Sequence, residues 1–403
     1  MTATSAAKKI HIIGGGVSGL FAAYHLKKLG HEVEIFEKAN RLGGLIQTLH
    51  LDWGVVETAA NGVLNSQKLE ALSQDLELEF VPALKKYKKR FIYRGKPRQF
   101  PLGIAESWKL IKNIFNNTKP NPRETLKDYA QRVYGSGAAQ YLVEPAVLGV
   151  FGAEARELSA TLVYNYFFGG KRHPAVAQPK RGTVAPAKGM AALIEALGSW
   201  LVRNGVKIHL SSPIEKLEAD SSGVTGDKIY IIATDALTAG DLLESIDADT
   251  SSLLKAIEYK PLSSVTVSYT EPTSIKGFGC LFPRDQGFQA FGVLFNTCIF
   301  DGRGPKATET WILPDAESSA DELIEKVKAD SRRLYKKEFV IQNSMITVWP
   351  RALPLYSLRL EEDLKLMSLP RGLYLTGNYL GQIGLSKIFE SAYQLAQRID
   401  KQN

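Results

Sequence analysis

The hydrophobic pattern is most regular at the beginning of the chain. Residues 9–13 (KIHII) form a short apolar run that predicts a buried strand, and residues 20–29 repeat apolar positions at helical spacing. Residues 32–36 (EVEIF) predict a second strand, which is followed directly by Glu37. The first strand and the helix are joined by residues 14–19 (GGGVSG). This order of strand, glycine-rich turn, helix and strand predicts a βαβ unit.

The glycines of this turn have the spacing of a dinucleotide-binding fold. Gly14 allows a tight turn, Gly16 lets the backbone approach a pyrophosphate, and Gly19 lets the helix pack closely on the strand. The start of the helix offers free N–H groups and the positive end of its dipole to phosphates. Glu37 follows Gly19 by 18 residues, where its carboxylate can accept ribose hydroxyls. We therefore predict a nucleotide site at this turn, rather than a glycine turn with a structural role alone.

A second glycine pair narrows the choice of cofactor. Asn40 and Arg41 precede Gly43 and Gly44, so more backbone N–H groups and a cation would lie near the pyrophosphate. This arrangement resembles the flavoproteins with two dinucleotide-binding motifs, which bind FAD. The alternative is an ordinary Gly-Gly turn beside a solvated arginine.

The later pattern predicts that the same domain is completed from distant parts of the chain. Residues 206–210 and 228–233 read as strands, and residues 213–218 are expected to continue the sheet. Near the end, residues 372–375 predict a buried strand, followed by a glycine-containing turn and a helix over about 384–399. The nucleotide-binding domain is thus expected to be discontinuous.

A second sheet is predicted between these parts. Residues 259–269 alternate apolar and small side chains, and 279–282, 290–295, 308–313 and 343–349 are further strands, which suggests an antiparallel sheet. We expect an amphipathic helix over 321–339 to cover it. Segments 90–93 and 98–100 flank Arg94–Pro97 and predict a hairpin.

A helical region is predicted from 101 to 168. Residues 104–116, 125–134 and 138–147 read as helices, and 169–186, rich in Lys, Arg, Pro and Gly, reads as a loop. The helix from Ile104 carries Trp, Ile, Phe and Lys side chains that suit either a small helical subdomain or contact with a membrane surface.

Composition narrows the class of protein. The 403 residues suffice for two or three domains, and the 44% hydrophobic and 23% charged content is ordinary for a globular protein. The net charge of +8 favours anionic ligands or surfaces, with the run Lys85–Arg90 as the densest cluster, but no basic-aromatic nucleic-acid motif is present. Cys280 and Cys298 predict two semi-buried thiols, and the six histidines lack ligand spacing, so we expect no metal.

The sequence contains neither an apolar signal-peptide core at its start nor a window of about 18 apolar residues. We therefore expect a cytoplasmic protein for which peripheral membrane contact, and a homodimer, stay open.

Five groups of segments resemble the protoporphyrinogen and coproporphyrinogen oxidases of haem and chlorophyll synthesis, in the flavin amine oxidase superfamily. The segments are HIIGGGVSGLFAAYHL with RLGG, KRFIYRGKPRQFP, VLGVFGAEARELS, GFGCLFP with FGVLFNTCIFDGRGP, and WPRALPLY with LTGNYLGQIGLSKIFESAY. The resemblance implies an α/β fold like that of p-hydroxybenzoate hydroxylase. It comprises an FAD-binding Rossmann-like domain (1–80, 187–250 and 370–403), an α+β substrate domain (81–100 and 251–369) and a helical domain (101–186).

The pattern and the resemblance together assign two sets of site residues. Those expected to bind FAD are Gly14, Gly15, Gly16, Val17, Ser18, Gly19, Glu37, Lys38, Arg41, Gly43, Gly44, Leu45, Asn61, Gly62, Ile214, Trp349, Gly377, Asn378, Ile383, Gly384 and Leu385. Those that the resemblance implies for the substrate are Arg90, Gly149, Phe278, Leu281, Leu294 and Ile312.

The implied reaction moves a hydride from a porphyrinogen carbon to flavin N5, with oxygen or another acceptor reoxidising the flavin. A porphyrinogen is a large apolar macrocycle with carboxylates at its edge, which suits apolar walls and a cation such as Arg90. Arg90 could equally be one more surface charge beside the lysine run. No catalytic acid or base is assigned.

The chain departs from the family pattern in two places near the expected site. Residues 59–62 (AANG) keep only the last glycine of a Gly-Pro-Arg-Gly-like run, and Tyr356 is not followed by Tyr-x-x-Gly-His. The chain is also shorter than typical members around 169–187 and 222–228. The substrate therefore stays open between a porphyrinogen and an amine or carotenoid-like compound, and a flavin-binding protein without redox turnover is a third alternative.

Overall fold

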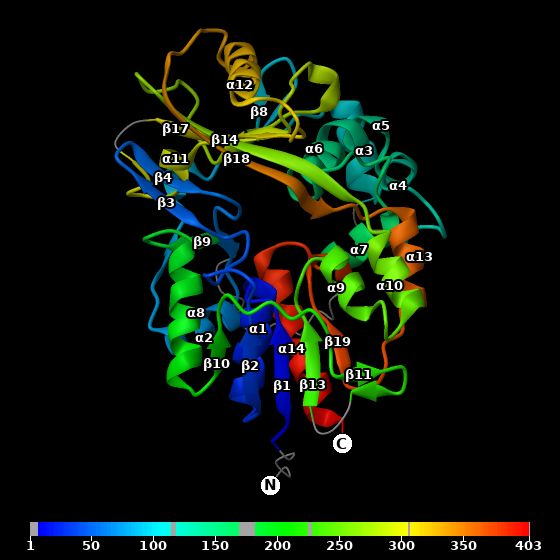
Figure 1. The fold of residues 1–403 in the computed structure, drawn as a ribbon. Coiled ribbons are helices and arrows are strands. Elements are labelled where there is room, and N and C mark those ends of the chain that lie inside the picture. The colour runs from blue at the N-terminus through cyan, green and yellow to red at the C-terminus, as the bar shows by residue number, and fades with distance from the viewer. Residues whose placement is uncertain (1–6, 114–117, 169–181, 225–227, 305–306, 403) are drawn as a thin grey trace.

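A parallel sheet forms the lower half of the molecule (Figure 1). The computed structural model describes residues 7–113, 118–168, 182–224, 228–304 and 307–402. The order of the five parallel strands in this sheet is β10-β2-β1-β13-β19. Their bounds are β1 Lys9–Ile13, β2 Glu32–Phe36, β10 Lys207–His209, β13 Lys228–Ile232 and β19 Leu373–Leu375. The start, the middle and the end of the chain thus meet in one sheet, as the pattern predicted.

Helices cover both faces of this sheet, which is why its strands read as continuous apolar runs. Ile10 and Ile12 pack in one hydrophobic cluster, whereas Ile13 and Ile232 pack in another on the opposite face. The first cluster includes α1 (Val17–Lys28), α2 (Gln67–Leu76), α8 (Ala191–Arg203) and α14 (Leu385–Lys401). The second includes α9 (Ala236–Leu243), α10 (Ala248–Lys255) and α13 (Leu358–Leu366).

The upper half is built on a seven-stranded sheet with the order β18-β14-β17-β16-β15-β7-β8 (Figure 1). Its strands are β7 Arg90–Tyr93, β8 Pro97–Arg98, β14 Tyr259–Tyr269, β15 Gly279–Leu281, β16 Gly292–Leu294, β17 Thr308–Leu313 and β18 Ile341–Pro354. The prediction of an antiparallel sheet was wrong at one pair, because β7 arrives from a distant part of the chain and pairs parallel with β15. The expected hairpin is confirmed by the pairing of β7 with β8.

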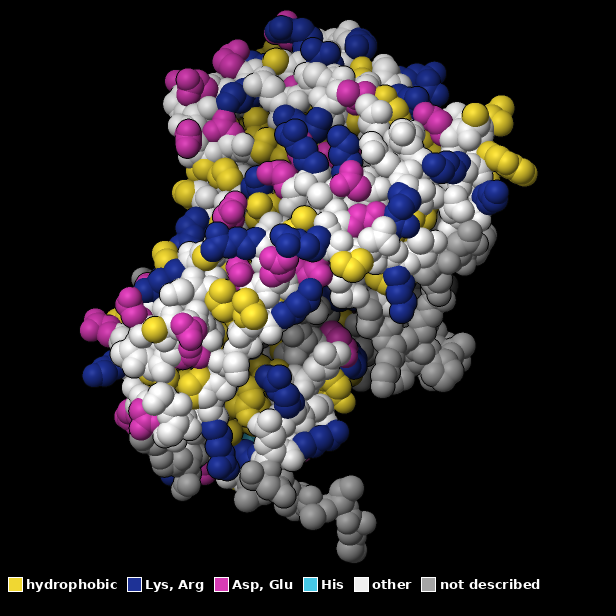
Figure 2. Space-filling view, turned by 90° about the vertical axis from the view of Figure 1, so that its right-hand side faces the viewer, with side chains coloured by type: hydrophobic (Ala, Val, Ile, Leu, Met, Phe, Trp, Pro, Cys, Tyr) yellow, Lys and Arg dark blue, Asp and Glu magenta, His cyan; other side chains and the backbone are white. Residues whose placement is uncertain are grey.

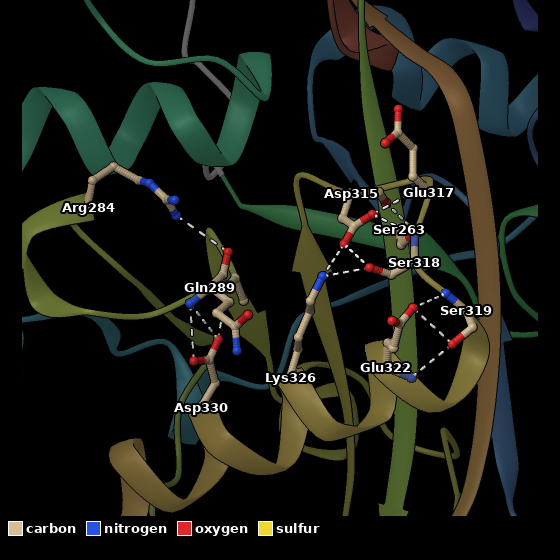
Figure 3. Close-up of polar contacts among 11 residues, drawn as sticks. Ser263, Arg284, Gln289, Asp315, Glu317, Ser318, Ser319, Glu322, Lys326 and Asp330 are labelled. Carbon is tan, nitrogen blue, oxygen red and sulfur yellow. Dashed lines mark hydrogen bonds and ion pairs between the residues drawn. The ribbon is translucent and has the colours of Figure 1, made fainter.

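Helix α12 (Ala320–Tyr335) covers one face of this sheet and is held by polar contacts at several points (Figure 3). Ser319 and Glu322 form a capping box at its start, and Lys326 contacts Asp315. Farther along, the buried Asp330 accepts hydrogen bonds from the N–H groups of Gln289 and Ala290. The helix ends earlier than predicted, because Lys336 adopts φ +55° and closes the last turn.

A group of short helices lies beside the upper sheet, and three small sheets complete the fold (Figure 1). The helices are α3 Ile104–Asn113, α4 Leu126–Tyr134, α5 Ser136–Ala138, α6 Glu144–Phe151 and α7 Ala160–Phe168, with α11 (Asn296–Ile299) elsewhere. The small sheets pair β3 (Thr48–Leu51) with β4 (Gly54–Glu57), β11 (Ala219–Asp220) with β12 (Gly223–Val224), and β9 (Thr183–Pro186) with both β5 (Val63–Leu64) and β6 (Phe80–Pro82).

Several local predictions need correction. Residues 213–218 do not continue the sheet: Pro213 lacks an N–H group, and the preceding Ser211 and Ser212 already pair with the backbone of Ala39 and Glu37. The loop predicted to end at Pro186 contains β9, while 169–181 lies outside the described residues. The helix predicted over 138–147 is a π-helical turn at 139–143 followed by α6. Helices α10 and α13 were not predicted.

Both cysteines are buried, and Cys280 is nearly inaccessible. Within the described ranges, no helix combines the length and the apolar content needed to cross a bilayer. The domain bounds given above stay predictions.

Candidate FAD site and substrate face

The glycine turn between β1 and α1 has the geometry that the spacing predicted. Gly14 adopts φ +108°, and a Cβ on Gly19 would overlap the carbonyl oxygen of Gly14. A Cβ on Gly16 would meet nothing within 4 Å, so the space in front of α1 is open. Helix α1 has neither a side-chain cap nor an acidic residue in its first turn. Its beginning is thus suited to an anionic group such as a pyrophosphate.

Glu37 is buried at the end of β2 and fixes the glycine turn. Its carboxylate accepts hydrogen bonds from the N–H groups of Gly15 (2.6 Å) and Ala39 (2.8 Å). A carboxylate offers about four acceptor positions, so both oxygens can still accept ribose hydroxyls. The segment before Ile214 runs past this carboxylate, because the N–H of Ser212 bonds to the carbonyl of Glu37.

The second glycine pair lies directly against the first. The N–H of Gly43 donates to the carbonyl of Gly15, and Gly43 and Gly16 form a parallel bridge. Arg41 is exposed and its guanidinium donates to the carbonyls of Leu42, Ile46 and Gly44 in its own loop. The predicted contact of Arg41 with phosphate would therefore require a different rotamer.

The loop at residues 58–62 is tied to the upper sheet. The indole N–H of Trp349 donates to the carbonyl of Thr58 (2.9 Å), which brings three predicted FAD residues, Trp349, Asn61 and Gly62, onto one loop and its support. A Cβ on Gly62 would lie 2.9 Å from Thr183, so this glycine allows close packing on β9.

A buried ion pair lies beneath this loop and was missed by the sequence analysis. Arg303 and Glu57 are both 4% exposed and their side chains are 2.6 Å apart. Glu57 also accepts hydrogen bonds from the N–H of Met190 and from the hydroxyl of Thr48. The other guanidinium nitrogen of Arg303 has no partner among the described residues, and a cavity of about 10 Å³ between Arg303 and Asn61 has room for about one water.

The C-terminal turn brings a second helix N-terminus to the same region. The turn after β19 contains Asn378, whose carbonyl accepts a hydrogen bond from the hydroxyl of Tyr356 (2.5 Å). Helix α14 then begins at Gly384, which adopts φ +82°. A Cβ on Gly384 would lie 3.4 Å from the hydroxyl of Tyr166 on α7. Burial raises the pKa of Tyr166, so this hydroxyl stays protonated at neutral pH. Ile383 is buried behind the turn, while Gly384 is exposed.

These residues fit a dinucleotide that carries a flavin. Two uncapped helix N-termini, two adjoining glycine pairs and a buried acceptor are gathered at the carboxyl ends of the parallel strands. Of the remaining predicted residues, Lys38 and Leu45 are exposed beside the glycine pairs. The individual contacts of all these residues with FAD stay predictions.

The predicted substrate residues share one face of the upper sheet. Cys280, Val293 and Trp311 pack against α12, whereas their neighbours Leu281, Leu294 and Ile312 point to the other face and are half-buried. Gly149 on α6 covers this second face, because a Cβ on it would lie 2.9 Å from Leu281. Leu294 and Phe278 also pack against the core of the FAD-binding half. The face thus lies between the two halves of the molecule.

Arg90 lies at the edge of this face. Its guanidinium stacks on the ring of Phe278, with 4.1 Å from the guanidinium carbon to the ring centre, and donates to the hydroxyl of Thr183 (3.2 Å). Burial lowers the pKa of Arg90, although an arginine stays charged at neutral pH. Within the described residues it has no carboxylate partner, so its charge is available to an anion.

Sequence similarity now adds to this geometry. Residues 17–399 match the family described as flavin containing amine oxidoreductase. The chain belongs to this family. It is therefore an FAD-dependent oxidoreductase, with a small-molecule substrate and an electron acceptor. A chloroplastic protoporphyrinogen oxidase of Oryza sativa subsp. japonica is 24% identical over 96% of this chain and 87% of its own length.

Two solved structures share the fold. A protein from Exiguobacterium sp. 255-15, described as a candidate protoporphyrinogen oxidase, superposes with a TM-score of 0.74 at 18% identity, covering 98% of this chain and 99% of its own. Cyclohexylamine oxidase from Brevibacterium oxydans IH-35A superposes with a TM-score of 0.70 at 16% identity, covering 98% and 100%. At these identities the likeness establishes the FAD-binding α/β fold and leaves the substrate to be decided by the site.

Proposed function

We propose that this enzyme oxidises a porphyrinogen, such as protoporphyrinogen IX or coproporphyrinogen III, to the porphyrin in tetrapyrrole synthesis. The observation that carries the proposal is the half-buried apolar face of Leu281, Leu294 and Ile312, with Arg90 at its edge. Among the residues that the structure describes, no carboxylate pairs with the Arg90 cation. A flat apolar ring system with carboxylates on its rim is complementary to such a surface. The similarity to the rice protoporphyrinogen oxidase supports the same substrate class.

The chain's own residues would bind and orient the substrate. Arg90 would pair with a rim carboxylate, and its stacking on Phe278 holds the guanidinium plane in place. Gly279 and Gly292 let Leu281 and Leu294 pack closely on the sheet face, because a Cβ on Gly292 would lie 3.1 Å from Leu281 and one on Gly279 would lie 3.4 Å from Leu294. FAD, when bound, supplies the hydride acceptor at N5. Apolar walls that keep water away from the ring complete the site.

The first test is anaerobic mixing of the FAD-loaded protein with each porphyrinogen, followed by flavin absorbance. Bleaching of the oxidised flavin band would establish hydride transfer and identify the preferred substrate. A protein that keeps its yellow flavin with both porphyrinogens, but is bleached by an amine, would overturn the proposal. The altered loop at Ala59–Asn61 is the specific observation that favours such another substrate.

Arg90→Ala tests the role of the cation. Loss of a charge-assisted contact is expected to raise KM for the porphyrinogen by roughly tenfold to a hundredfold, with a smaller change in kcat. Arg98→Ala is the matched control, because Arg98 is an exposed arginine on the neighbouring strand β8. Equal kinetics for Arg90→Ala and the wild type would remove Arg90 from the site.

We also propose that α3 touches a membrane surface. Ile104, Trp108 and Ile111 on this helix are 94%, 73% and 58% exposed, and the neighbouring Phe100 is 54% exposed. An exposed apolar face with lysines beside it is typical of helices that lie at a bilayer interface. Sedimentation with anionic vesicles should carry down the wild type and leave Trp108→Glu/Ile104→Glu in solution. Equal sedimentation of the two proteins would contradict this contact.

A further inference from the structure

A second hollow lies far from the substrate face, on the outer edge of the parallel sheet. Figure 2 views the side of the molecule that carries α13 and the free edge of β19, and shows a hollow with hydrophobic side chains inside it and Lys or Arg side chains around it. A groove of about 570 Å³ is lined there by the end of α13, the segment that follows it, β19 and the end of α14. Ligand sites commonly have volumes of about 300–1,000 Å³.

One side of the groove is apolar. Leu364, Met367, Leu369 and Leu380 line it and are half-buried, so each keeps hydrophobic surface exposed. Leu366, next to them on α13, is 69% exposed. Such a surface is stabilised when an apolar chain covers it.

The other side of the groove is cationic. Arg371 and Arg398 both line it, and the guanidinium carbon of Arg398 lies 5.2 Å from the ring centre of Tyr374. Within the described residues, neither arginine forms an ion pair with a carboxylate, in contrast to Arg94, Arg132 and Arg303. The hydroxyl of Tyr374 donates to the side chain of Gln402, which also lines the groove. Burial raises the pKa of Tyr374, and the positive charges of Arg398 and Arg371 both oppose that rise.

We propose that this groove binds an amphipathic anion, namely an acyl chain with a carboxylate or phosphate head group. The head group would lie between Arg371 and Arg398, where guanidinium groups can bind its oxygens in a bidentate manner. The acyl chain would cover Met367, Leu369 and Leu380. This chemistry is distinct from that of the substrate face, whose cation and walls come from the upper sheet.

The site also has a structural connection to the flavin region. Leu380, on the apolar side of the groove, ends the short 3₁₀ turn Asn378–Leu380 that begins directly after Gly377. Asn378 is the residue whose carbonyl accepts the hydroxyl of Tyr356. An acyl chain seated against Leu380 would therefore contact the turn that contains Asn378 and directly follows Gly377, both of which are predicted to bind FAD.

The test is equilibrium binding to the FAD-loaded full chain. Palmitate and lysophosphatidate serve as the two head-group probes, and acetate and inorganic phosphate serve as head groups without a chain. We expect saturable binding of one probe molecule per chain, with the preferred head group shown by the tighter of the two probes. Weak binding of acetate and phosphate is expected, because they lack the apolar part.

Two variants separate the cationic and the apolar sides. Arg371→Ala/Arg398→Ala should weaken probe binding by about tenfold or more for each arginine removed. Arg359→Ala, an exposed arginine on α13 outside the lining, is the matched control and should bind like the wild type. Met367→Glu should weaken binding by placing a carboxylate on the apolar side. In each variant the flavin spectrum and Tm report whether the fold is kept.

Two results with the wild type or the double variant would overturn the proposal. Absence of saturable binding to the wild type, or equal affinity in the double arginine variant, would remove the site. If inorganic phosphate bound as tightly as lysophosphatidate, the arginines would form an anion site without a place for an acyl chain. None of these outcomes depends on whether the enzyme oxidises porphyrinogens.

Discussion

Helix α12 in the upper half begins differently from helices α1 and α14 in the lower half. In the upper half, α12 starts with a capping box, in which Ser319 and Glu322 satisfy each other's backbone N–H groups. In the lower half, α1 and α14 begin at Gly16 and Gly384 without a side-chain cap or an acidic residue in the first turn. Free N–H groups at a helix start need acceptors. Helices α1 and α14 face the expected cofactor, which indicates that a ligand accepts hydrogen bonds from their first N–H groups.

Helix α8 is an intermediate case. It has no local side-chain cap, yet its first N–H groups are bound by residues distant in sequence. Glu57 accepts from Met190, and the Thr48 hydroxyl accepts from Ala191. Glu57 is in turn held by Arg303 from the upper half. A helix start can thus be completed locally, by a remote side chain, or by a ligand, and only the first kind is readable from neighbouring residues.

Breaking the remote cap should have the largest effect. Arg303→Met leaves Glu57 as a buried charge without a cation, which typically costs about 3–5 kcal/mol. The measurement is the free energy of unfolding in urea at neutral pH. The affinity for FAD should also fall, because the 58–62 loop lies above this ion pair.

The controls separate loss of the pair from loss of volume. Glu57→Gln/Arg303→Met removes both charges and should regain a large part of the lost stability. Arg332→Met removes a 58% exposed arginine from a surface pair and should change stability by less than about 1 kcal/mol. An equally small change in the free energy of unfolding for Arg303→Met would show that groups other than Arg303 stabilise the Glu57 carboxylate.

Closing an open helix start should have the next largest effect, on cofactor binding rather than on stability. Gly16→Asp fits sterically, since a Cβ there meets nothing within 4 Å, and gives α1 an N-cap. The carboxylate would occupy the place of a phosphate and repel it. We expect FAD affinity to fall by roughly a hundredfold or more, while the apoprotein keeps or slightly raises its Tm.

Gly16→Ala distinguishes charge from bulk in this experiment. It adds a Cβ without a carboxylate, so its FAD affinity should lie between that of the wild type and that of Gly16→Asp. Higher salt should reduce the difference between the two variants by screening the repulsion. Wild-type affinity in Gly16→Asp would show that FAD phosphates do not approach α1.

The sequence predicted the first βαβ unit of the lower half well because its signals are local. The glycine spacing, the strands on either side of α1 and the acid at the end of β2 lie within one short stretch. The upper sheet was predicted less well, because the parallel pairing of β7 with β15 joins residues far apart in the chain. Alternation along a strand identifies two faces, but it does not say which strand is the neighbour.

The residues of the candidate site likewise include some that the sequence predicted and some that it did not. The residues near glycine turns, and those carried by the family resemblance, were named before the fold was known. Arg303, Glu57 and Tyr166 were not, since nothing near them in the sequence shows that an arginine and a glutamate 246 positions apart share one buried contact. The pairing of a buried charge is a property of the tertiary structure, so only the fold could show it.

The smallest effect should come from the local cap of α12. Ser319→Ala removes the acceptor of the Glu322 N–H and should destabilise the protein by about 1 kcal/mol. Ser319→Asp keeps an acceptor at this position and should retain the wild-type Tm. FAD affinity should be unchanged in both variants, because α12 lies on the face of the upper sheet that points away from the substrate residues. A lower FAD affinity in Ser319→Ala would mean that the start of α12 is coupled to the starts of α1 and α14. The upper sheet would then transmit changes at α12 to the cofactor site.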